Sequence, residues 1–98
     1  MRLTDAGFLK RLRSIAKDSH RVVLTRHARQ RMKQRRINSR QVMECLLKGR
    51  IYEAAHQTIH GDWKATIEHQ YAGDLVRVAV AIERQEDGDL AVVVTVME

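Results

Sequence analysis

The spacing of apolar residues changes at Gly49, and this change limits the possible folds more than any other feature of the chain. Before Gly49 apolar residues recur at helical spacing, and after it they alternate with a period of two, as in half-buried strands. A run of helices followed by a run of strands indicates an α+β domain. We therefore predict two or three N-terminal helices packed on one face of a four-stranded antiparallel sheet.

The first helix is predicted over about residues 4–18, because apolar residues recur at helical spacing from Phe8 to Ala16. Thr4 and Asp5 are both suitable N-cap residues, since an oxygen-bearing side chain can accept from the free backbone N–H groups of the first turn. The sequence leaves open which of the two caps the helix.

Two further helices are predicted after a short extended piece, RVVL, at residues 21–24. Thr25 is placed to cap a second helix over 26–36, which contains no Gly or Pro to stop it. Asn38 can cap a third helix, and the side chain of Gln41 can reach back to complete a capping box.

Gly49 is predicted to end the third helix as its C′ residue. Four strands are then predicted, at residues 51–60, 63–71, 74–83 and 89–97. Gly61 and Asp62 form a plausible two-residue hairpin turn between the first two. The last strand is apolar on both faces, which predicts that it lies at the centre of the sheet.

The length of 98 residues predicts a single domain, 1–98, with a basic helical part at 1–49 and a sheet at 50–98. We expect neither a membrane span, which needs about 18 apolar residues, nor a signal peptide at the charged N-terminus. A single cysteine fits a reducing cytoplasm, and Cys45, next to two leucines, is expected to be buried rather than nucleophilic.

The net charge of +6 is unevenly distributed. Residues 1–50 hold 15 Lys/Arg and 3 Asp/Glu, or +12, whereas residues 51–98 hold 3 and 9, or −6. A concentrated positive half is typical of a surface that binds RNA or another nucleic acid. Alternatively, the positive charge could be used within the molecule, with basic helices packed against an acidic sheet.

The second helix concentrates the charge. On a helical wheel Ala28 and Met32 form a narrow apolar stripe, and His27 and Arg31 share one flank of it. A helix N-terminus among arginines favours the neutral imidazole, which can accept a proton, and the guanidinium of Arg31 could hold a phosphate. The residues predicted to bind nucleic acid are Arg26, Arg29, Lys33, Arg35 and Arg36.

Residues 25–37 read T-R-H-A-x-x-R-M-x-x-R-x-I, which resembles the opening signature of a small bacterial family, domain of unknown function 4258. The likeness covers roughly residues 20–97. In size and layout the chain is also similar to the RelE and ParE toxin group, whose ribonuclease members place helices before an antiparallel sheet. The resemblance implies RNA cleavage without a metal or other cofactor, by the RNA's own 2′-hydroxyl, and a small acidic antitoxin-like protein as a further partner.

The resemblance implies His27, Arg31 and Arg77 as catalytic residues, with Thr25 opening the helix. One departure concerns the end of the last strand, where family chains often have an aromatic residue and this chain has Met97. If that aromatic residue stacks on a base or aids catalysis, the chain lacks it.

The same residues also admit structural roles. Thr25 would be only a cap, His27 would bond a backbone carbonyl, and Arg31 would pair with a carboxylate of the sheet, namely Glu53, Glu68 or Glu83. The domain would then be a non-catalytic module that binds nucleic acid or a protein.

Three weaker alternatives remain. His56, His60 and His69 could approach one another as zinc ligands, although their spacing does not guarantee convergence, and we predict no metal site. Trp63 and Tyr71 are interpreted as core residues or as a base-stacking platform. The second and third helices could form a helix-turn-helix, but the third is too apolar to read a groove easily.

Overall fold

The structure is a computed structural model that describes residues 3–97. The described part contains three α-helices, one 3-10 helix and five strands. In chain order these are α1 (Asp5–Ala16), η1 (Ser19–Arg21), β1 (Val22–Leu24), α2 (Arg26–Arg35), α3 (Ser39–Lys48), β2 (Arg50–Gln57), β3 (Trp63–Tyr71), β4 (Asp74–Glu83) and β5 (Leu90–Met97). The predicted α+β class is confirmed.

All five strands form one sheet in the order β1-β5-β4-β3-β2, so the predicted number of four strands is wrong by one. The additional strand is the short extended piece before α2. It pairs parallel to β5, with Val22 opposite Ala91 and Leu24 opposite Val93, whereas all other neighbours are antiparallel. Three residues are too few to show strand periodicity, which is why the sequence did not reveal this pairing.

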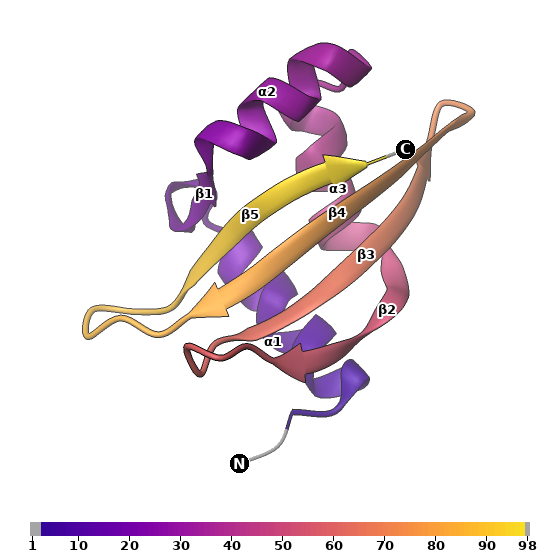
Figure 1. Cartoon of the computed structure of the whole chain (residues 1–98). Helices are drawn as coiled ribbons and strands as arrows, with labels where there is room; N and C mark the ends of the chain where they lie inside the picture. The colour runs from indigo at the N-terminus through magenta and orange to yellow at the C-terminus, as the bar shows by residue number, and fades with distance from the viewer. Residues whose placement is uncertain (1–2, 98) are drawn as a thin grey trace.

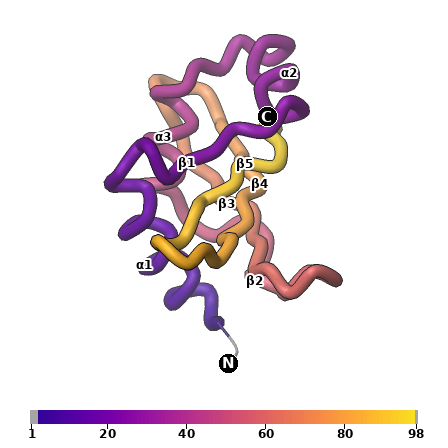
Figure 2. Tube along the Cα trace, turned by 90° about the vertical axis from the view of Figure 1, so that its left-hand side faces the viewer, coloured from indigo at the N-terminus to yellow at the C-terminus, as the bar shows by residue number. Residues whose placement is uncertain are grey.

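The helices α1 and α3 lie on one face of the sheet, and no helix in residues 3–97 covers the opposite face of β2–β5 (Figure 1). We call this second face the open sheet face. Helix α2 lies at one end of the molecule, where it packs mainly on β5 (Figures 1 and 2). The prediction that the helices share one face of the sheet therefore holds for α1 and α3. None of the helices in residues 3–97 is long and apolar enough to cross a membrane.

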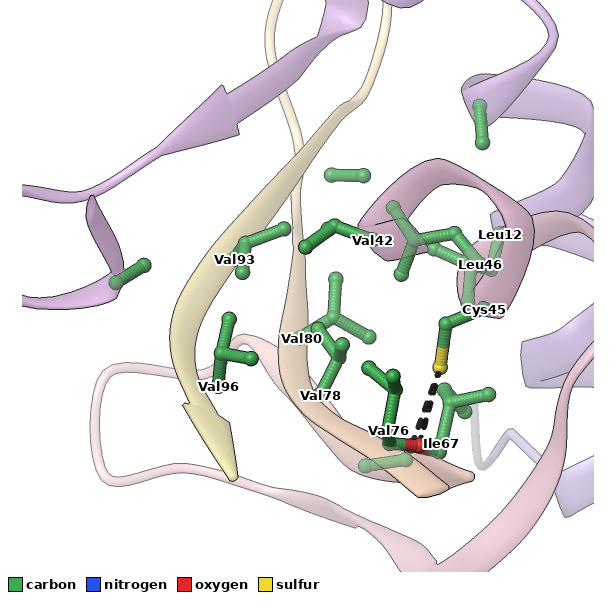
Figure 3. Close-up of a cluster of buried hydrophobic side chains, with 14 of the residues drawn as sticks. Leu12, Val42, Cys45, Leu46, Ile67, Val76, Val78, Val80, Val93 and Val96 are labelled. Carbon is green, nitrogen blue, oxygen red and sulfur yellow. Dashed lines mark hydrogen bonds between the residues drawn. The ribbon is translucent and has the colours of Figure 1, made fainter. Parts of the chain in front are cut away.

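The core lies between α1, α3 and the sheet (Figure 3). Leu46 of α3 and Val78 of β4 are both fully buried. Cys45 is also buried, as predicted, and its Sγ lies 3.4 Å from the backbone oxygen of Ile67, to which the thiol donates. Burial, and then the charge of Glu68, raises the pKa of the Cys45 thiol to about 12. Because α3 uses its apolar stripe in this core, it is not an exposed recognition helix.

The predicted caps of α1 and α3 are present. Thr4 caps α1 by accepting a hydrogen bond from the backbone N–H of Gly7 at 3.0 Å. The carboxylate of Asp5, the alternative cap, instead accepts a hydrogen bond at 2.8 Å from the backbone N–H of Ala55, which lies in β2. Asn38 and Gln41 form the complete capping box at the start of α3.

Gly49 ends α3, but not for the predicted reason. Its φ of −72° is open to any residue, so it is not a left-handed C′ glycine. Glycine is required there by close packing, because a Cβ atom would lie 2.6 Å from Cγ2 of Ile67 and 2.8 Å from the backbone oxygen of Glu68. The left-handed helix end occurs at Arg36, with φ 55°, so α2 stops one residue earlier than predicted.

The prediction that the last strand is central holds in that β5 is an interior strand, paired with β1 on one side and with β4 on the other, but β4 occupies the middle of the sheet order. The regular alternation predicted for β5 is interrupted. Val80 pairs with Val93 and Ala79 pairs with Thr95, so Val94 is an extra residue, a β-bulge. After the bulge the buried residue is Val96, which shares the core with Ala91 and Val93.

The turn between β2 and β3 is longer than the predicted two residues. Strand β2 ends at Gln57, and Thr58–Asp62 form the connection, closed by a hydrogen bond from the N–H of Thr58 to the oxygen of Asp62 at 2.7 Å. His60 therefore lies in a turn and not in a strand.

Candidate nucleic-acid interface

Thr25 fixes the start of α2 against β5. Its Oγ1 accepts a hydrogen bond from the N–H of Ala28 and donates one to the backbone oxygen of Val94, both at 3.0 Å. Its own N–H donates to the oxygen of Val93 at 3.2 Å. Because the bulge at Val94 turns backbone groups toward Thr25, the position of α2 depends on β5.

His27 lies in the first turn of α2 with its side chain in solvent. Next to it, Ala28 is fully buried and holds the helix on the core. The structural role considered for His27, a hydrogen bond to a backbone carbonyl, does not occur within residues 3–97, where the imidazole makes no hydrogen bond or ion pair. The imidazole is therefore accessible to a ligand.

Arg31, one turn further along α2, is half-buried. Its Nε is shielded from solvent and has no hydrogen-bond partner in the described part of the chain. The proposed pairing with a sheet carboxylate does not occur at Glu68, whose ion pairs are with Arg50 and Arg77. Because both residues belong to the helix α2 and are four positions apart, their side chains leave it on the same flank.

The remaining cations of the motif surround these two residues. We call the exposed basic side chains of this helix and its end the α2 surface: Arg26, His27, Arg29, Lys33, Arg35 and Arg36. No acidic residue occurs in the sequence between Asp18 and Glu44, so the helix carries no carboxylate to neutralise it. Arg29 also donates from Nε to the oxygen of Leu24 at 3.4 Å.

Arg77, the third predicted catalytic residue, lies elsewhere. It stands in β4 between Val76 and Val78, both fully buried in the core, so its side chain points to the open sheet face. Within residues 3–97 no hydrogen bond, ion pair or ring contact joins it to His27 or Arg31. Strand β5, which pairs with β4 and packs on α2, lies between them.

Around Arg77 the structure brings together a charged row that crosses three strands. Glu68 pairs in register with Arg50 of β2 on one side and with Arg77 of β4 on the other. Its carboxylate accepts from Nε of Arg77 at 2.9 Å and from the guanidinium of Arg50 at 3.1 Å. The hydrogen bond from Arg77, and next that from Arg50, hold the pKa of the Glu68 carboxyl below its ordinary value.

Tyr52 completes this cluster and was not singled out from the sequence. The guanidinium carbon of Arg77 lies 3.9 Å from the centre of the Tyr52 ring, a cation–π contact. Tyr52 sits where the pairing of β2 with β3 shifts register between Ile51 and Glu53. A bulge of this kind leaves no clear trace in the alternation of residues, so there was little signal by which to find it.

Other predicted candidates do not converge. His56 and His69 lie in β2 and β3 and His60 lies in a turn, and no group of three metal-ligating side chains occurs among the described residues. Trp63 packs against the core, as its structural interpretation predicts.

A match to a family model decides which family the chain belongs to. The family model of a domain of unknown function, DUF4258, matches residues 24–98. The chain belongs to this family. In this DUF4258 domain the matched region begins one residue before the Thr25 cap and includes the whole motif, α3 and the strands β2–β5.

Comparison of this DUF4258 domain with curated proteins and with solved structures gave no match. The likeness to RelE and ParE toxins remains a prediction from the sequence.

Proposed function

We propose that this DUF4258 domain is a metal-independent endoribonuclease: it binds RNA phosphates on the α2 surface and cleaves the backbone beside His27 and Arg31. The observation that carries the proposal is an exposed imidazole, unbonded within residues 3–97, four positions before a half-buried arginine on a helix that has no acidic residue. Phosphate contacts supply most of the affinity of such surfaces for nucleic acids.

The reaction uses groups of the RNA, side chains of α2 and water. The 2′-oxygen of the RNA attacks the adjacent phosphorus while Nδ1 or Nε2 of His27 accepts its proton. The bond to the 5′-oxygen breaks, and this oxygen takes a proton from water, leaving a 2′,3′-cyclic phosphate and a 5′-hydroxyl. The imidazolium of His27 then gives its proton to the hydroxide so formed, which restores water and the neutral imidazole. The guanidinium of Arg31 stabilises the negative charge that develops on the phosphate oxygens.

Burial gives Arg31 a fixed position, which a flexible surface arginine would not have. Its covered Nε has no hydrogen-bond partner in residues 3–97. A phosphate oxygen would accept hydrogen bonds from the other N–H groups of the same guanidinium. Arg77 lies across β5 and is held by Glu68, so we assign it to RNA binding on the open sheet face rather than to this reaction.

The same surface would bind a small acidic protein, because charge complementarity does not distinguish a phosphate chain from a row of carboxylates. Such a protein would compete with RNA. The proposal places the domain in the cytoplasm, where RNA is present and the lone thiol of Cys45 stays reduced.

Salt dependence of RNA binding tests the role of the α2 surface. For single strands the slope of log affinity against log salt falls by roughly 0.7 for each phosphate contact removed. Replacing Arg29, Lys33 and Arg36 together with glutamine should therefore flatten the slope by about 2. The matched control replaces three other exposed cations, Lys10, Lys17 and Arg84, and should leave the slope unchanged. Equal slopes for both triple variants would contradict the proposal.

A further inference from the structure

We propose that Tyr52, together with the row Arg50–Glu68–Arg77, forms a second RNA contact on the open sheet face, where one unpaired base stacks on the Tyr52 ring. This inference rests on the proposed function, since it takes the ligand to be RNA. It adds a residue that the sequence motif does not include, on a strand distant from α2.

The geometry of Tyr52 suits stacking. One side of its ring packs on the guanidinium of Arg77, 3.9 Å from the ring centre, which holds the ring in place. The residue is nevertheless 49% exposed, so the ring also presents surface to solvent. A base added there would form a stack of guanidinium, phenol and base, and such stacking tolerates any base because every base has a π face.

The surroundings of Tyr52 favour an anionic ligand. A cavity of about 490 Å³ opens beside Arg77 and falls within the roughly 300–1,000 Å³ of small-ligand sites. Among the described residues that line it are three cations, Lys48, Arg50 and Arg77, and one carboxylate, that of Glu68. The Arg50 side chain is 83% exposed although it pairs with Glu68, so it can also reach a phosphate. In this arrangement the cations of the cavity bind the phosphate of the nucleotide whose base stacks on Tyr52.

Glu68 is a positioning residue in this arrangement. Its carboxylate bonds Arg50 and Arg77 at once and aligns both guanidinium groups along the row. Met97 of β5 pairs in register with Arg77 and is not aromatic, whereas Tyr52 of β2 places its ring on the Arg77 guanidinium. The aromatic group comes from β2 rather than from the end of β5.

The experiment compares two single-stranded ligands of equal charge and length, a 2′-O-methyl oligoadenylate and the corresponding 2′-O-methyl ribose-phosphate oligomer without bases, neither of which has the 2′-hydroxyl that cleavage needs. Wild type should bind the oligoadenylate more tightly. Tyr52→Ala should weaken binding of the oligoadenylate about 5- to 150-fold, the usual effect of losing one stacked base, and leave the oligomer without bases unaffected. Tyr52→Phe, which keeps the ring, should restore the preference, and Lys17→Gln at the C-cap of α1 should change neither affinity. Circular dichroism checks that each variant is folded.

Two results would overturn this second contact while leaving the proposed function intact: wild type binding both ligands equally, or Tyr52→Ala retaining the full preference for bases. If wild type binds neither ligand at low salt, the proposed function itself fails and this contact fails with it.

Discussion

The hydroxyl of Thr25 joins the first turn of α2 to the bulge of β5, because it donates to the backbone oxygen of Val94 while it accepts from the N–H of Ala28. An N-cap residue that bonds only the N–H groups of its own helix would not fix the direction of that helix relative to the sheet. Here the second bond ties the helix to the sheet, and it therefore fixes where His27 and Arg31 emerge from the core.

Thr25→Val should remove both hydrogen bonds while keeping the shape of the side chain. Loss of an N-cap costs about 0.5–2 kcal/mol of stability, and we expect a value in the upper part of that range because the bond to Val94 is lost too. Urea unfolding measures the change, and hydrogen exchange should show faster exchange in the first turn of α2. Thr25→Ser, which keeps the hydroxyl, is the control; a similar loss in both variants would show that the hydroxyl is not responsible.

Glu68 should make the stability of the domain depend on pH in acid. Because Arg77 and Arg50 lower the pKa of its carboxyl in the folded state, the stabilising contribution is complete above the unfolded-state pKa. It is lost as the pH falls through the lower, folded-state pKa. Glu68→Gln should therefore lose less stability than wild type between about pH 5 and about pH 3.

Thermal unfolding across that pH range measures this difference. Glu86→Gln, an exposed carboxylate in the turn between β4 and β5, serves as the control and should follow wild type. If the unfolding temperatures of wild type and Glu68→Gln fell in parallel with pH, the two arginines would not hold the carboxylate ionised.

Gly49→Ala should destabilise the domain through overpacking, by about 1–3 kcal/mol. The new Cβ would lie 2.6 Å from Cγ2 of Ile67 and would also collide with the backbone oxygen of Cys45. Gly61→Ala is the comparison, because an added Cβ there would meet no atom of the described residues within 4 Å, and its cost comes only from the φ of 88°. Methyl resonances of Ile67 should move in the first variant and not in the second; unchanged resonances in Gly49→Ala would contradict the packing argument.

Features that depend on short-range chemistry were predictable from the sequence. The caps at Thr4, Thr25 and Asn38 follow from side chains that bond backbone groups three residues away. The common flank of His27 and Arg31 follows from helical geometry alone.

Features that depend on strand register were not predictable. A shift of one residue moves every side chain of a strand to the other face of the sheet. The row Arg50–Glu68–Arg77 exists only because the turn at 58–62 and the bulges in β2 produce one particular register. The same limit applies to β5, where the bulge at Val94 places Val96 in the core against the expected alternation.

The central claim, proton transfer by His27, is tested most directly by cleavage of unstructured RNA in the presence of a chelator. Wild type should cut RNA to 2′,3′-cyclic phosphate ends and leave DNA of the same sequence intact. His27→Ala should cut about 10²–10⁴-fold more slowly with RNA affinity retained, whereas Arg31→Ala should lose both rate and affinity. The control is His20→Ala, which removes an imidazole that is 96% exposed on η1 and should leave the rate unchanged. If wild type cuts nothing, or if His27→Ala cuts as fast as wild type, His27 has no catalytic role and the domain only binds its partner.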